Sequence, residues 1–115
     1  MFFWVDGNCT GLALSAVMKE SSTDPSKLAR FSDNINKGRQ GVVEYVNSIG
    51  AKLIFASGDD VFFEAHTFID ENKIKNIYLS VSGQTCSISS GKTIKEALDN
   101  MTKTKACAHG KIKYD

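Results

Sequence analysis

Residues 53–64 have the sequence LIFASGDDVFFE, and this stretch decides how the rest of the chain is arranged. Two predominantly apolar runs, residues 53–56 and 61–64, flank the segment Ser57-Gly58-Asp59-Asp60, and the second run ends at Glu64. Aromatic and branched residues favour strands, whereas Gly and Asp are typical of the tight turn between two strands. The stretch therefore predicts a β-hairpin that carries two adjacent carboxylates at its turn.

The part of the chain before the hairpin predicts a strand and two helices. Residues 2–5 form a continuous apolar run, which is typical of a central strand. A small-residue turn over residues 7–11 leads to a short helix over residues 12–19. Asp24 and Pro25 mark the start of a long helix, whose apolar stripe continues to Ile49 and ends at Gly50. Gly38 lies on this stripe, so we expect something to approach the backbone closely there, a packed strand rather than a ligand.

The part after the hairpin predicts a weakly patterned helix over residues 67–76 and strands over residues 77–81 and 85–89. A capping box then opens a last helix at Thr93. Its inward residues are expected to be Ile94, Ala97, Leu98 and Met101, and residues 111–114 are expected to form an edge strand.

The predicted order is β-α-β-β-α-β with an added helix and a C-terminal strand, in one domain over residues 1–115. This is an α/β (α+β) pattern of the ferredoxin-like type, which RNA-binding modules share with the palm domains of polymerases and cyclases. The fold by itself does not choose among these functions.

The composition excludes several functional classes. The 115 residues carry a net charge of +1, so no basic surface for DNA or RNA is expected. The apolar start of the chain is too short for a signal peptide or a membrane span, which predicts a cytoplasmic protein without a membrane partner. The three cysteines are odd in number and lack paired spacing, which indicates free thiols.

Three aspartates are the strongest candidates for chemistry. In a β-α-β-β-α-β sheet the first and third strands are neighbours, so Asp6 is expected beside Asp59 and Asp60. Such carboxylates repel one another unless a cation lies between them, and carboxylate oxygens suit Mg²⁺ or Mn²⁺. Two ions about 4 Å apart would form a phosphoryl-transfer site. The alternative is that Asp59 and Asp60 only form a polar hairpin turn.

Further candidates surround these acids. Lys105 continues the inward stripe of the last helix, where it would need a counter-charge such as a triphosphate, although it could also extend to solvent. The turn Gly7-Asn8-Cys9-Thr10-Gly11 precedes a helix, so its N–H groups could face phosphate and a carbonyl such as that of Gly7 could complete a metal shell. The turn could equally be only a connection.

These stretches resemble the minimal CRISPR polymerase family, a stand-alone version of the palm domain of type III CRISPR complexes and a distant relative of GGDEF diguanylate cyclases. The resemblance rests on Val5-Asp6-Gly7-Asn8 through Gly11, on residues 55–61, and on residues 87–89, 93–105 and 110–112. Two positions depart from the relatives. Ser57 replaces the first glycine of the GGDD hairpin, and Asp60 replaces the glutamate of GGDEF enzymes, which favours the CRISPR type.

The resemblance implies a Mg-dependent nucleotidyltransferase that makes a cyclic di- or oligoadenylate from ATP in anti-phage defence, with a separate effector that senses the product. It implies a homodimer, because one palm carries one triphosphate and cyclisation needs two. By carry-over the metal ligands and catalytic residues are Asp6, Asp59 and Asp60, with Gly7 as a further ligand, and the nucleotide-binding positions are Gly7, Asn8, Cys9, Thr10, Gly11, Ser57, Gly58 and the phosphate lysine Lys105.

Two other functions stay open. An RNA-binding module on the same fold could stack bases on Phe2, Phe3 and Trp4. A catalytically inactive palm could bind a nucleotide as a sensor.

Overall fold

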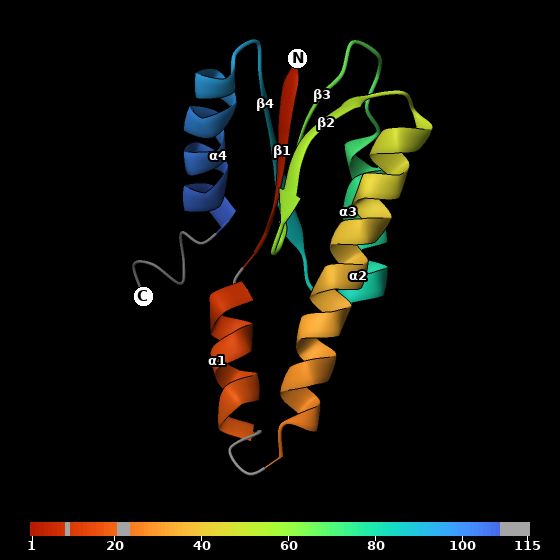
Figure 1. Cartoon of the computed structure of the whole chain (residues 1–115). Coiled ribbons are helices and arrows are strands. Elements are labelled where there is room, and N and C mark those ends of the chain that lie inside the picture. Colours follow the sequence, from red (N-terminus) through yellow and green to blue (C-terminus); the bar gives the residue numbers. More distant parts are fainter. Residues whose placement is uncertain (9, 21–23, 109–115) are drawn as a thin grey trace.

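The computed structural model describes residues 1–8, 10–20 and 24–108 of the chain. In this part it contains, in chain order, the elements β1 (Phe2–Gly7), α1 (Thr10–Glu20), α2 (Ser26–Ser48), β2 (Lys52–Ser57), β3 (Asp60–Glu64), α3 (Glu71–Ser82), β4 (Cys86–Gly91) and α4 (Ile94–Ala108). Figure 1 shows these elements around one sheet.

The sheet is antiparallel and has the strand order β2-β3-β1-β4. With α2 and α3 as the two connecting helices, this order confirms the predicted ferredoxin-like α+β fold. The helix α1 is the addition between β1 and α2, and α4 follows the last strand. The predicted edge strand over residues 111–114 lies outside the described residues.

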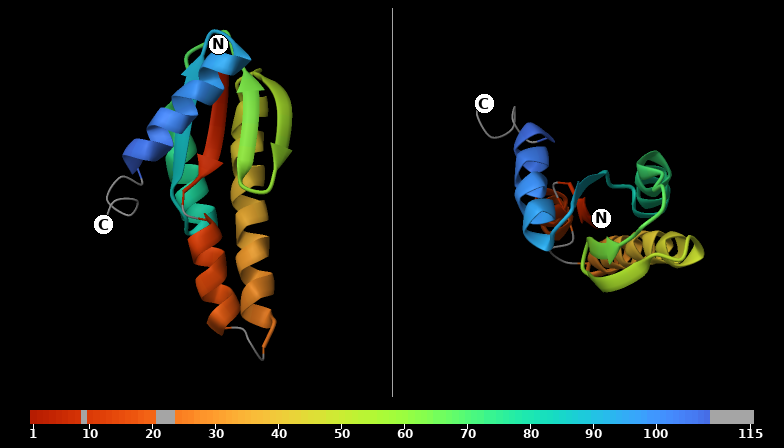
Figure 2. Two further views of the ribbon diagram at one scale, coloured as in Figure 1. Left: turned by 90° about the vertical axis from the view of Figure 1, so that its left-hand side faces the viewer. Right: turned by 90° about the horizontal axis from the view of Figure 1, so that it is seen from above.

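The two faces of the sheet are covered differently. The helices α2 and α3 lie on one face, while α4 lies on the other, beside β4 and β1 (Figures 1 and 2). Because successive strand residues point to opposite faces, Phe3 and Val5 are buried toward α2 and α3, whereas Trp4 and Asp6 point to the opposite face. The strands β2 and β3 therefore have one face that no helix of the described chain covers completely.

The prediction of a strand over residues 77–81 is wrong. These residues belong to α3, in which Ile74, Tyr78 and Ser82 are buried at intervals of four. The Asp70 side chain accepts the N–H of Lys73 at the start of this helix, and Gly83, at a φ of +76°, ends it. Burial at helical spacing therefore decided the conformation of a segment whose residues favour strands.

Gly38 marks a close approach of α2 to α3. A Cβ atom at this position would lie 2.8 Å from the Ser82 Cβ and 3.2 Å from the Tyr78 ring. The sequence correctly predicted a close neighbour at Gly38, but that neighbour is the helix α3 and not a strand.

The inward face of α4 is narrower than predicted. Ala97 and Met101 are buried against the sheet, as expected, and the Ser89 hydroxyl donates to the Ala97 carbonyl. Ile94 and Leu98, however, are 49% and 42% exposed. They lie on the flank of α4 because this helix packs over β4 and β1 and leaves the β2 side of the sheet open.

No helix in the described part of the chain is both long enough and apolar enough to cross a bilayer.

We predict that Gly38→Ala lowers the free energy of unfolding relative to Gly11→Ala by about 1–3 kcal/mol. Both glycines are in helices, so both variants gain helix propensity, but an added Cβ at Gly11 meets nothing within 4 Å. Chemical denaturation of the two variants measures the difference. Equal stabilities would show that α2 and α3 are not in close contact at Gly38.

Candidate functional site

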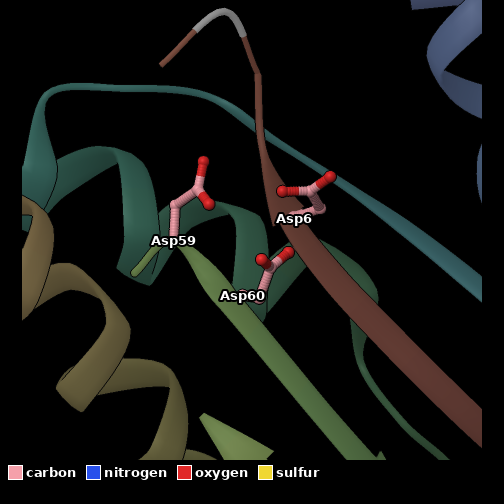
Figure 3. Close-up of side chains that lie close together, drawn as sticks. All are labelled: Asp6, Asp59 and Asp60. Atoms are coloured by element: carbon pink, nitrogen blue, oxygen red, sulfur yellow. The ribbon is translucent and has the colours of Figure 1, made fainter. Parts of the chain in front are cut away.

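The centre of the candidate site is a pair of aspartates on neighbouring strands. Asp6 on β1 lies directly opposite Asp60 on β3 in the antiparallel register, and Asp59 precedes Asp60 at the hairpin turn. Each of the three side chains offers a carboxylate oxygen, and these oxygens lie within 4.8 Å of one another (Figure 3). The structure therefore brings together the three acids that the sequence predicted to meet.

The electrostatics of this cluster are unfavourable without a counter-ion. Like charges directly opposite on two strands destabilise a sheet. Burial, followed by the hydrogen bond and the negative charge of Asp60, raises the pKa of Asp6 to about 7, against a smaller opposing effect of Lys105. Below about pH 7, Asp6 therefore holds a proton that a divalent cation would displace.

Trp4 fixes the orientation of one acid. Its indole Nε1–H donates to Oδ1 of Asp60 over 2.9 Å. Trp4 and Asp6 point to the same face because they are two residues apart on β1. The acid pair is thus tied to the face of the sheet opposite α2 and α3.

Lys105 reaches the acids from α4, and its side chain is 21% exposed. Its ammonium Nζ lies 3.5 Å from the Asp6 carboxylate, donates to the Asp6 carbonyl over 3.3 Å, and also donates to the Gly7 carbonyl. Lys105 thus binds the Gly7 carbonyl, the oxygen that the sequence analysis predicted as a further metal ligand. A positive charge nevertheless lies beside the acids, as expected for a phosphate-binding lysine.

Asn8 is held by β4 and by the same lysine. Its Oδ1 accepts from the Ser87 hydroxyl over 2.6 Å and from Lys105 over 3.0 Å, and its Nδ2 donates to the Thr85 hydroxyl. Its backbone N–H donates to the Thr85 carbonyl. The Asn8 side chain therefore orders the end of β1, a contact that the sequence could not reveal.

The hairpin turn is held by an arginine that the sequence analysis missed. Gly58 has a φ of +57°, and its carbonyl accepts from Nη1 of Arg39 over 2.8 Å. Arg39 also donates to Oδ1 of Asn36 over 3.0 Å, while the Gly7 N–H donates to the Asp59 carbonyl. Arg39 thus places a positive charge beside the hairpin turn. Only the folded structure reveals this, because α2 must lie beside the turn to bring Arg39 there.

A pocket of about 230 Å³ opens beside Asp59, between α1 and α2. It has apolar walls and, besides Asp59, two polar side chains; the lining residues are Leu14, Phe31, Ser32, Ile35, Asn36, Gly58 and Asp59. Ser32 and Asn36 were not singled out from the sequence, because they lie beside the apolar stripe of α2 and face the hairpin only in the folded chain.

The other predicted nucleotide-binding positions are placed as follows. Ser57 ends β2 and pairs with Asp60. Thr10 begins α1, and Gly11 belongs to this helix, which therefore starts earlier than the predicted residue 12. The expected turn over residues 7–11 is accordingly shorter, and Cys9 lies outside the described residues.

Cys86 is a buried free cysteine that does not belong to the acid cluster. Its thiol is buried, and burial raises its pKa to about 11, which keeps the sulfur protonated and unreactive.

The donor set fits a hard divalent cation. Three carboxylates at one sheet edge supply oxygen ligands, and two of them face each other across the strand pair. The pKa of Asp6 is raised first by burial and then by Asp60, and both effects favour a bound cation in place of the proton. Asp6, Asp59 and Asp60 are therefore the residues that would hold Mg²⁺ or Mn²⁺.

We predict a pH dependence of stability that belongs to Asp6. Because its pKa is raised on folding, Asp6 stabilises the metal-free protein below pH 3.8 and loses this contribution as the pH rises to about 7. In thermal unfolding with a chelator, Asp6→Asn should remove this decline. Added Mg²⁺ should stabilise the unmodified chain most above pH 7, where the cluster is ionised. An identical pH profile for the chain and for Asp6→Asn would contradict the assignment.

In a comparison with known protein families, residues 2–114 match the minimal CRISPR polymerase domain. No curated protein and no solved structure was found to match the chain. The family match covers β1, the acidic hairpin and α4, the elements that build the site. The chain belongs to the minimal CRISPR polymerase family.

Proposed function

We propose that the protein is a metal-dependent nucleotidyltransferase that joins ATP into a cyclic di- or oligoadenylate. The observation that carries this proposal is the meeting of Asp6, Asp59 and Asp60 within 4.8 Å, with Lys105 beside them, in a chain of a CRISPR polymerase family. The family and the expected product support a role in anti-phage signalling, in which a separate effector senses the cyclic nucleotide.

The reaction is a substitution at phosphorus. A ribose hydroxyl oxygen of one ATP forms a bond to the α-phosphorus of another. The bond from this phosphorus to the oxygen that bridges to the β-phosphate breaks, and pyrophosphate leaves with the electron pair. The hydroxyl proton passes to solvent. A second transfer of the same kind closes the ring.

Bound metal ions would lower the pKa of the attacking hydroxyl and neutralise the departing pyrophosphate. The protein supplies position and charge. Asp6 and Asp60 hold their oxygens on one face of the sheet, and the Trp4 indole keeps Asp60 in place. Lys105 has hydrogen bonds to carbonyl oxygens of Asp6 and Gly7, which it can exchange for phosphate oxygens.

The pocket between α1 and α2 suits the base of the nucleotide whose α-phosphate is attacked. It adjoins Asp59, it has apolar walls for a flat ring, and Ser32 and Asn36 offer polar groups to the ring edge. Arg39 holds Oδ1 of Asn36, which leaves the amide N–H₂ of that side chain free for an acceptor on the base. The second nucleotide must reach the same carboxylates, and a second copy of the chain would carry it there.

We predict that the protein converts ATP with Mg²⁺ or Mn²⁺ into a product that resists phosphatase. Asp60→Asn should lower its formation at least about a hundredfold, because a ligand of the transferring site is lost. Asp99→Asn is the matched control, since Asp99 is an exposed acid on α4. Mass spectrometry of the product identifies the ring. Unchanged turnover in an Asp59→Asn, Asp60→Asn double variant would show that these acids are not the site.

We predict that Asn36→Leu weakens the selection among nucleoside triphosphates more than it lowers the turnover of ATP. The substitution keeps the volume of the pocket wall and removes the polar edge contact. Competition of ATP with the other three triphosphates, analysed by product composition, measures the effect. If the products of Asn36→Leu and of the unmodified chain have the same composition, the base is selected elsewhere.

A further inference from the structure

Arg39 connects two parts of the wall of the pocket beside Asp59. It is half-buried on α2, and its Nη1 group donates to Oδ1 of Asn36 over 3.0 Å and to the Gly58 carbonyl over 2.8 Å. Nη1 carries two hydrogens, so each of the two oxygens accepts one of them. Asn36 and Gly58 line the pocket, whereas Arg39 does not. Arg39 therefore acts on this pocket only through the groups that it holds.

The contact with Asn36 fixes the orientation of an amide. An asparagine amide accepts on one side and donates on the other, and a half-turn exchanges the two. Asn36 is exposed, so burial does not restrict this rotation. A guanidinium only donates, so it can hold the oxygen of the amide but not the nitrogen. Hydrogen bonds from a charged donor are about twice as strong as neutral ones. Arg39 thus keeps Oδ1 of Asn36 toward itself and leaves the Nδ2 group for a ligand.

The other lining groups do not discriminate between base edges. Ser32 lies one helical turn before Asn36, and its hydroxyl both donates and accepts, so it adapts to either kind of edge. The walls formed by Leu14, Phe31 and Ile35 are apolar and contact any flat ring in the same way. Selection between bases therefore depends on the Asn36 amide and on the group that fixes it.

We propose that Arg39 sets the base selectivity of this pocket by fixing the Asn36 amide with its N–H₂ group toward the base. The identity of the ligand rests on the proposed function, which assigns the pocket to a nucleotide. At position 1 of the purine ring, adenine has an acceptor nitrogen and guanine has an N–H group. A fixed N–H₂ group pairs with the first, but it meets the second as donor against donor and leaves both unpaired. The pocket therefore takes adenine and rejects guanine at this edge.

The second contact of Arg39 joins the pocket to the acids. Gly58 precedes Asp59 in the hairpin turn and has a φ of +57°. The Gly7 N–H holds the next peptide of the turn, because it donates to the Asp59 carbonyl. A base that pairs with Asn36 is thus placed relative to the arginine that also holds the hairpin. Arg39 is a positioning residue, which acts on the base through Asn36 and on the hairpin through Gly58.

The charge of Arg39 predicts a different result from its geometry. A guanidinium near a triphosphate attracts every nucleotide, whatever its base. The loss of that attraction would weaken the binding of ATP and of GTP by the same factor, and the ratio of the two affinities would not change. A change in this ratio therefore separates a fixed amide from a general electrostatic effect and from a local loss of structure.

The test measures the binding of the α,β-methylene analogues of ATP and GTP by calorimetry with Mg²⁺. A methylene group replaces the bridging oxygen at the bond that breaks, so binding is measured without turnover. We expect the unmodified chain to prefer the ATP analogue, and Arg39→Met to lower the ratio of the two affinities about tenfold. Arg30→Met is the matched control and should leave the ratio unchanged. Arg30 is the other arginine of α2, is exposed and does not line the pocket.

Two variants of Asn36 test whether Arg39 acts through the amide. In an Asn36→Leu background, Arg39→Met should leave the affinity ratio unchanged, because no amide remains to be held. Asn36→Asp keeps an acceptor for Arg39 but has no donor, so it should move the preference from the ATP analogue to the GTP analogue. The proposal is overturned by an unchanged ratio in Arg39→Met, by an equal change in both backgrounds, or by an ATP preference that Asn36→Asp retains.

Turnover of ATP separates this proposal from the proposed function. If the affinity ratio changes as expected but no cyclic product forms with either metal, Arg39 sets the selectivity of a nucleotide-binding palm and the proposed function fails. If cyclic product forms while Arg39→Met keeps the affinity ratio of the unmodified chain, the function stands and the role of Arg39 is overturned. Equal affinity of the unmodified chain for both analogues would also overturn it, because the pocket would then have no selectivity for Arg39 to set.

Discussion

The structure depends on one electrostatic constraint, the placement of Asp6 directly opposite Asp60 in the β1–β3 pair. The antiparallel register that buries the apolar residues of both strands also places these two carboxylates face to face. Shifting the register by one residue would separate the acids, but it would also turn the buried residues of β1 to the wrong face. The register that buries the core therefore also brings the two acids together. A bound cation would relieve the repulsion between the acids and leave the packing of the core unchanged.

The surroundings of the acids offset part of this repulsion. Lys105 brings positive charge from α4 to Asp6 and also binds the carbonyls of Asp6 and Gly7, while Arg39 on α2 binds the Gly58 carbonyl of the hairpin turn. The pKa of Asp6 is nevertheless raised to about 7. Burial is the largest cause of this shift and the neighbouring Asp60 is the next, so Lys105 offsets only part of the cost of ionising Asp6.

The helices cover the two faces of the sheet unequally, and a hollow remains on each side of the acids. The helices α2 and α3 bury one face, and α2 continues past the sheet beside α1, where the pocket beside Asp59 forms (Figure 1). On the other face, α4 covers β4 and β1 only, which leaves an apolar groove open beside Asp60, lined by Trp4, Ile54, Phe55, Phe62, Ile94 and Leu98. The acids thus lie between a pocket with polar edges and a groove without them.

The sequence by itself determined the ferredoxin-like order, the acidic hairpin and the neighbouring positions of Asp6, Asp59 and Asp60, because local patterns set these elements and their topology sets which strands are adjacent. Only the tertiary structure decided that residues 77–81 are helical, since contacts with α2 at Gly38 outweigh the strand propensity of that segment. The exposure of Leu98, the position of Arg39 and the two hollows beside the acids also depend on where helices lie over the sheet. Helix placement results from packing between residues distant in the chain, which no local pattern encodes.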